Sequence, residues 1–126
     1  MQVLSDNQTG TISTSSQTYV TTSQSLSITP SSASNKVLVL FDCGVATLGA
    51  NTGIDIDIRR AGTSIAESGM YTATVSGNLS TMGGTSVLDS PNTTSATTYE
   101  VFYRETALAG TVNLYQRRLH LLEVKG

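Results

Sequence analysis

Residues 25–41 read SLSITPSSASNKVLVLF and predict a strand, a turn and a second strand. In the first part, Leu26 and Ile28 alternate with small polar residues, which is the pattern of a strand with one buried face. Pro30 ends this strand because proline has no N–H to donate to a neighbouring strand. The polar residues that follow suit a turn. The run from Val37 to Phe41 is entirely apolar, which predicts a strand covered on both faces.

A second alternating segment predicts a hairpin downstream. Ile54, Ile56 and Ile58 alternate with charged residues, so we expect the isoleucines to face the core. Gly62 can adopt the positive φ of a tight turn, and Ile65 is then the inward residue of the returning strand.

Two further strands are predicted toward the C-terminus. Tyr99, Val101 and Tyr103 share one face of the first, and residues 118–125 form the last. No stretch of about a dozen residues keeps a helical period. Roughly eight to ten short strands at this spacing predict an all-β fold, a jelly-roll-like antiparallel β-sandwich.

The composition predicts one charge-poor domain. Of the 126 residues, 1–14 are predicted to form an N-terminal arm and 15–126 the β-sandwich domain. Charged residues make up 13% and the net charge is -2, which provides no electrostatic attraction for nucleic acid or an anionic membrane. The sequence has neither the pattern of a signal peptide nor an apolar run of transmembrane length. A surface with few charges is poorly protected against self-association, which favours a domain that works inside an assembly.

The sequence shows no pattern typical of catalysis, cofactor binding or metal binding. His120 is the only histidine and Cys43 the only cysteine, whereas transition-metal sites combine several such ligands. Asp55 and Asp57 face outward on their predicted strand. A calcium site there would need further oxygen ligands, and a glycosidase pair would need an apolar pocket. We therefore predict a protein without enzymatic activity.

Six short segments share a pattern with a known group of domains. They are Gln2-Val3, residues 26–39 (LSITPSSASNKVLV), residues 58–65 (IRRAGTSI), residues 88–91 (LDSP), residues 97–99 (TTY) and residues 122–124 (LEV). In these segments the chain resembles a small β-sandwich virion structural domain of tailed phages, especially of cyanophages and marine phages. Each segment is a strand end or a turn of the kind that fixes strand register.

The resemblance implies a non-enzymatic virion protein without cofactor that forms a homo-oligomer, expected to be a trimer. Such domains look like parts of tail fibres, head fibres and capsid decorations. A compact chain with a short arm favours a capsid decoration or cement protein on the outer surface of the head, with the major capsid protein as its partner. We expect capsid contact through the start of the arm, at Gln2, Val3 and Leu4. We expect self-association through the apolar last strand, at Leu119, Leu121, Leu122 and Val124.

Two other functions are compatible with the sequence. A short tail- or head-fibre domain would recognise host surface polysaccharide through two predicted loops, Val45 to Gly53 and Gly77 to Gly84. A secreted carbohydrate-binding or hydrolytic domain is disfavoured because the chain has no tryptophan and no signal peptide.

Overall fold

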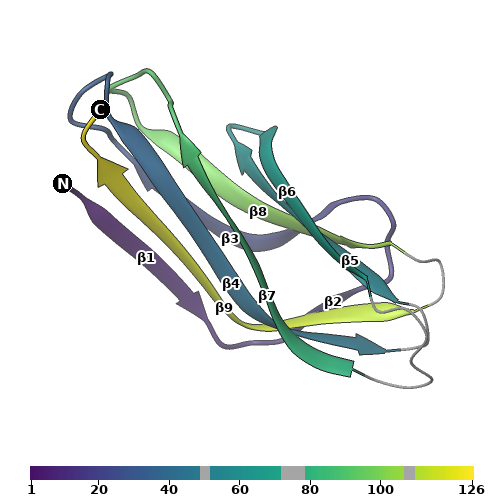
Figure 1. The fold of residues 1–126 in the computed structure, drawn as a ribbon. Coiled ribbons are helices and arrows are strands. Elements are labelled where there is room, and N and C mark those ends of the chain that lie inside the picture. Colours follow the sequence, from purple (N-terminus) through teal and green to yellow (C-terminus); the bar gives the residue numbers. More distant parts are fainter. Residues whose placement is uncertain (49–51, 72–78, 107–109) are drawn as a thin grey trace.

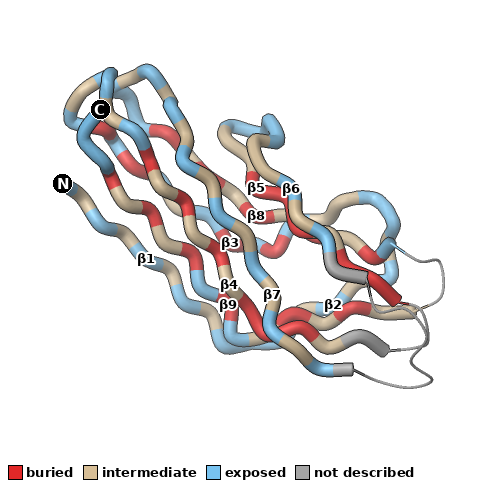
Figure 2. Tube along the Cα trace, in the orientation of Figure 1, coloured by how far each residue is buried: buried red, intermediate tan, exposed pale blue. Residues whose placement is uncertain are grey.

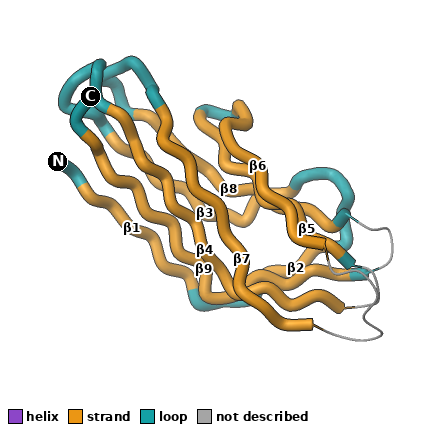
Figure 3. Tube along the Cα trace, viewed as in Figure 1, coloured by secondary structure: helices purple, strands orange, loops and turns teal. Residues whose placement is uncertain are grey.

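The computed structural model describes residues 1–48, 52–71, 79–106 and 110–126, and these contain nine strands. The strands are β1 (Val3–Gln8), β2 (Ile12–Thr14), β3 (Val20–Ile28), β4 (Lys36–Leu48), β5 (Gly53–Arg60), β6 (Thr63–Tyr71), β7 (Leu79–Asp89), β8 (Thr97–Glu105) and β9 (Thr111–Val124). Figure 3 shows strands joined by loops, with no helix in the described part of the chain.

The strands form two antiparallel sheets that face each other (Figure 1). Sheet A has the order β1-β9-β4-β7, with β2 also paired to β9, and sheet B has the order β3-β8-β5-β6. The chain is folded like one long hairpin rolled up on itself. β5 pairs with β6 at its tip, β4 with β7, β3 with β8, and β1 and β2 with β9. This nesting is a jelly roll and confirms the fold class predicted from the sequence.

One hydrophobic core fills the space between the sheets (Figure 2). Its fully buried members are Ile28 from β3, Val37, Val39, Phe41, Cys43 and Val45 from β4, Ile54, Ile56 and Ile58 from β5, Tyr99, Val101 and Tyr103 from β8, and Val112, Leu114, Leu119 and Leu121 from β9. The alternation read from the sequence therefore assigns the inward faces of β5 and β8 correctly. Ile65 on β6 also packs against this core, as predicted.

The N-terminal segment, predicted as an arm at residues 1–14, is paired into sheet A. β1 pairs with β9 from Val3↔Leu122 to Gln8↔Arg117, and β2 pairs with β9 around Ser13↔Asn113. Between the two strands, the buried Arg117 guanidinium donates to the Gly10 carbonyl oxygen and to Gln8 Oε1, each at 2.8 Å. β1 and β2 thus act as one interrupted edge strand, and Arg117 holds the interruption in place.

β4 and β7 extend through parts of both segments that the sequence predicts as loops. β4 continues to Leu48 and β7 begins at Leu79, and the two strands pair throughout. A Cβ on Gly84 would meet the Phe41 carbonyl oxygen, and one on Gly44 would meet the Tyr115 ring. Glycine is therefore required at both positions for close approach rather than for a loop. The remaining parts of these predicted loops, 49–51 and 77–78, lie outside the described residues.

Candidate functional site

The outer face of sheet A carries the most distinctive surface of the molecule. Its outward side chains form three rows across the four strands, because the registers of β1, β9, β4 and β7 align. In the order β1, β9, β4 and β7, the first row is Val3, Leu122, Leu38 and Leu88, the second is Ser5, His120, Leu40 and Ser86, and the third is Asn7, Arg118, Asp42 and Gly84.

The first row is entirely aliphatic and open to solvent. Val3 is 59% exposed and Leu88 is 51% exposed, while Leu38 and Leu122 are half-buried between them. Val124 is two residues beyond Leu122 on β9 and lies on the same face. It extends the apolar surface and is itself exposed. An apolar strip that crosses a whole sheet is the kind of feature that marks an interaction site on a soluble domain.

This face also corrects one prediction. The run from Val37 to Phe41 was expected to be covered on both faces. In the structure Val37, Val39 and Phe41 are buried in the core, but Leu38 and Leu40 point to the other side, where no layer of the described chain covers them.

The full charges within the rows pair with each other. Arg118 on β9 donates through Nε to Asp42 Oδ2 on β4 at 2.8 Å, and the two residues face each other directly in the ladder. His120, the only histidine, lies half-buried beside them and points away from Leu119 and Leu121 as predicted. The rows therefore present a face that is apolar at one end and has a neutral ion pair at the other.

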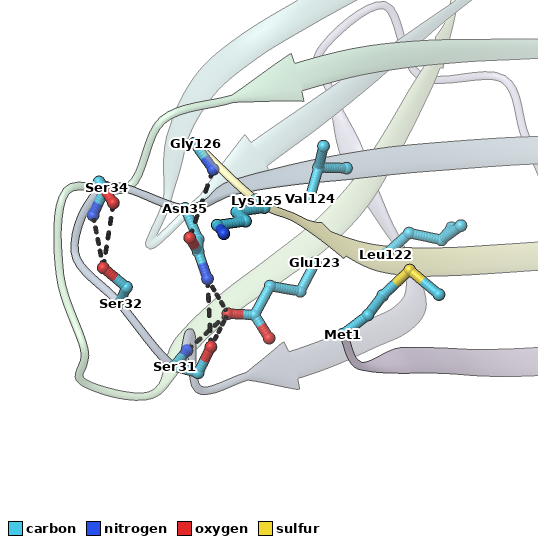
Figure 4. A pocket seen from close by; sticks show the side chains of 10 residues that line it. All are labelled: Met1, Ser31, Ser32, Ser34, Asn35, Leu122, Glu123, Val124, Lys125 and Gly126. Carbon is cyan, nitrogen blue, oxygen red and sulfur yellow. Dashed lines mark hydrogen bonds between the residues drawn. The ribbon is translucent and has the colours of Figure 1, made fainter.

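A hollow of about 510 Å³ adjoins the aliphatic end of this face, beside both chain termini (Figure 4). Leu122 and Val124 line one side, and Ser31, Asn35 and Glu123 line another. Glu123 Oε1 accepts hydrogen bonds from Ser31 N at 2.6 Å, Ser31 Oγ at 2.7 Å and Asn35 Nδ2 at 2.7 Å. These hydrogen bonds, with that of Asn35 the strongest, lower the pKa of Glu123 to about 2. The carboxylate is thus engaged in holding the turn after Pro30.

The second carboxylate oxygen of Glu123, Oε2, could accept a further hydrogen bond. It is buried and has no hydrogen-bond partner among the described residues. Because this oxygen is buried, a ligand in the hollow meets the apolar wall and the exposed serine hydroxyls instead.

Other segments of the shared sequence pattern also prove to be structural contacts. Arg60 Nη1 donates to both carboxylate oxygens of Asp89 at 2.8 Å, and Tyr99 Oη donates to Asp89 Oδ2 at 2.7 Å. The segments IRRAGTSI, LDSP and TTY therefore meet at one point, where they tie sheet B to the end of β7. They define the scaffold rather than a reactive site.

The structure separates the residues predicted for self-association. Leu119 and Leu121 are 0% exposed in the core of their own chain, so they are unavailable to a second chain. Leu122 and Val124 alternate with them and lie on the outer face of sheet A. The prediction is thereby restricted to these two residues.

The residues predicted for capsid contact also divide between two faces. Val3 belongs to the exposed aliphatic row, whereas Leu4 packs against the core. Gln2 holds the start of β1 in place, since its Nε2 donates to the Thr29 carbonyl oxygen and its own carbonyl oxygen accepts from Glu123 N.

The outer face of sheet B carries two arginines that are paired with carboxylates and stacked on aromatic rings. The Arg59 guanidinium lies 4.1 Å from the Phe102 ring centroid, and the Arg104 guanidinium lies 4.4 Å from that of Tyr19. Each arginine also binds one carboxylate of β5: Arg59 binds Asp57 and Arg104 binds Asp55. These interactions give Asp55 and Asp57 a structural role, and neither lies in an apolar pocket of the kind that a glycosidase acid needs.

The described residues bring together no reactive or metal-binding cluster. Cys43 is buried, and burial, reinforced by neighbouring Asp42, raises the pKa of its thiol to about 12, so it is an inert part of the core. In the described ranges, no three His, Cys, Asp or Glu side chains group so as to hold a metal ion. The same ranges contain no helix long and apolar enough to cross a membrane.

Sequence reasoning missed Leu38, Leu40 and Leu88 as surface residues. Their alternation with core residues was visible in the sequence, but the pairing of the strands was not. Leu38 and Leu40 alternate with core residues of β4, and Leu88 precedes the Asp89 that ends β7. Strand order was needed to show that the leucines form one row with Val3 and Leu122.

Comparison with known proteins supports the fold. No family model and no curated protein matches the chain. Among solved structures, a chain from the structure of infectious bursal disease virus, Gx strain, aligns with a TM-score of 0.56 and 9% identity over 98% of this chain and 36% of that chain. The insecticidal delta-endotoxin Cry8Ea1 from Bacillus thuringiensis aligns with a TM-score of 0.49 and 15% identity over 91% of this chain and 20% of that chain. The chain spans well under half the length of either neighbour, and at 9% identity the viral chain shows a common β-sandwich fold alone.

Proposed function

We propose that this chain is a non-enzymatic structural protein of a virus particle, specifically a phage capsid decoration or cement protein on the outer surface of the head. The observation that carries the proposal is the solvent-exposed aliphatic row Val3, Leu122, Leu38 and Leu88 on a charge-poor sandwich. The similarity in fold to a chain of a virus structure and the resemblance of the sequence to phage virion domains support it.

The proposed mechanism is stabilisation by burial without chemistry. Apolar surface removed from water contributes about 25 cal/mol per Å², so a face of this kind strengthens a lattice wherever subunits cover it. β1 is also the edge strand of sheet A, and its unpaired main-chain groups are available for additional hydrogen bonds to a neighbouring subunit. The proposed partners are the major capsid protein and further copies of this chain, with a trimer as the oligomer implied by the sequence resemblance.

Imaging of whole particles tests the location. We expect copies in the hundreds at regular positions on the head, as the lattice of a capsid imposes. A few copies confined to the tail, together with binding of the purified protein to host cells, would instead identify a fibre domain and contradict the proposal.

Occupancy of the particle by variants tests the surface. Val3→Asp introduces a charge into the aliphatic row at an exposed position, so the fold is retained while apolar contact is lost. Ser25→Asp, at an exposed position on the outer face of sheet B, is the matched control. We expect V3D to lower occupancy at least tenfold and S25D to leave it unchanged. Equal occupancy of both variants would exclude this face as the contact surface.

A further inference from the structure

The outer face of sheet A is chemically self-complementary. A line that runs along the strands, midway between β9 and β4, divides the face into two halves, with β1 and β9 on one side and β4 and β7 on the other. A half-turn about such a line places β9 over β4 of a second chain and β1 over β7, and it leaves each row opposite the same row.

The aliphatic row matches itself under this operation. Leu122 lies opposite Leu38 of the second copy, and Val3 lies opposite Leu88. Apolar side chains therefore meet apolar side chains across the whole row. In the second row the small residues at the two edges, Ser5 and Ser86, also oppose each other, which leaves room for His120 and Leu40 at the centre.

The ion pair matches itself as well. Arg118 of one copy lies opposite Asp42 of the other, and the reverse contact forms on the other side of the axis. Four charges then alternate in sign, so neither copy loses an ion-pair partner when the faces are desolvated.

The area sets the strength of the contact. Between the pair Lys36↔Val124 and the pair Asp42↔Arg118, β4 and β9 each contribute seven residues, β7 six and β1 five, and together these cover on the order of 400 Å² per chain. Two such faces bury about 800 Å² in projection, which is below the roughly 1,200–2,000 Å² of stable specific interfaces and in the range of weak, transient contacts. The expected contact is reversible, with a micromolar dissociation constant.

We infer that the outer face of sheet A docks a second copy of this chain as a two-fold dimer in which Leu122 packs on Leu38 and Arg118 pairs with Asp42 across the axis. The twist of the two sheets turns their strands about 30° apart, so the match is tightest at the central strands β4 and β9. The inference concerns the free protein in solution, where no capsid covers this face, and it does not depend on the proposed virion role.

Sedimentation velocity of the purified chain, from about 1 μM to about 500 μM, tests the dimer. We expect a monomer–dimer equilibrium. Leu122→Lys should weaken it at least tenfold, whereas Thr98→Lys on the outer face of sheet B should not change it. A monomer at every concentration, a trimer, or an unchanged dimer in L122K would overturn the inference.

Charge-swapped variants test the geometry. Asp42→Arg gives every copy two arginines in the third row, and Arg118→Asp gives every copy two aspartates, so each variant alone should dissociate. An equimolar mixture places each arginine of one variant opposite an aspartate of the other and should recover a mixed dimer. Both substitutions are at partly exposed side chains, and circular dichroism of each variant checks that the fold is retained. Failure of the mixture to associate would rule out this axis.

The outcomes separate the dimer from the virion role. A monomer in solution that nevertheless decorates heads would overturn the dimer alone. A dimer that never occurs on particles would overturn the virion role alone.

Discussion

Glu123 joins the last strand to the turn that follows Pro30. Three donors from Ser31 and Asn35 converge on one of its oxygens, and the side chain is 1% exposed. The strand–turn–strand unit of residues 25–41 is therefore fixed by a residue about 90 positions away, which no local pattern in that unit reveals. A single carboxylate thus fixes the position of the turn that separates β3 in sheet B from β4 in sheet A.

This carboxylate makes stability depend on pH in a defined window. The folded state holds the pKa of Glu123 at about 2, below the ordinary glutamate value near 4.3. The ionised carboxylate therefore stabilises the fold fully above about pH 4.3, and this stabilisation is lost as the pH falls toward 2. We expect Glu123→Gln to lower the melting temperature by several degrees at pH 7. We also expect it to flatten the decrease in stability between about pH 5 and pH 2.

Thermal unfolding followed by circular dichroism at several pH values measures both effects. Glu67→Gln, which removes an exposed carboxylate from β6, is the matched control and should keep the wild-type pH profile. If E123Q and the wild type lose stability in parallel below pH 5, Glu123 is not the group responsible.

At the scale of elements, β1 demonstrates how one strand serves two surfaces. Leu4 packs against the core, and its neighbour Val3 lies in the aliphatic row outside. We expect Leu4→Ala to lower the free energy of unfolding by about 1–2 kcal/mol, because it removes a partly buried side chain. Val3→Ala should change it by less than about 0.5 kcal/mol.

Urea unfolding of the two variants decides whether β1 is an integral strand. Both positions lie in the part of β1 that pairs with β9. The difference between the two changes in unfolding free energy therefore reflects the burial of the Leu4 side chain. Equal and negligible effects would mean that β1 does not contribute to the stability of the sandwich.

The strands predicted best are those with one apolar face and one charged or polar face. Ile54, Ile56 and Ile58 alternate with charged residues, and the structure buries all three. The run from Val37 to Phe41 was predicted only in part. An apolar run indicates that both faces avoid water, but it does not tell whether the second cover is another layer of the same chain or another subunit.

The candidate site was predicted least well because it is a property of strand order. Leu38, Leu88, Leu122 and Val3 are far apart in sequence, and only the registers of sheet A bring them into one row. The glycine-rich start of β7 was predicted as a loop for a related reason. Gly84 allows close approach to β4, and a glycine needed for close approach looks the same in a sequence as a glycine needed for a turn.

At the scale of the whole molecule, the nested pairing predicts that the two sheets unfold together. Both sheets contribute to one core. Tyr99 and Tyr103 are buried in sheet B and the chain has no tryptophan, so tyrosine fluorescence reports mainly on that sheet, while far-ultraviolet circular dichroism reports on both. We expect the two signals to give the same urea midpoint when they are measured at a low protein concentration that excludes self-association. We also expect folding to take on the order of milliseconds to seconds, because almost every strand pair is distant in sequence. Two separate midpoints would show that sheet A, with its exposed outer face, is stable without sheet B, and the single shared core would then not be what holds the fold together.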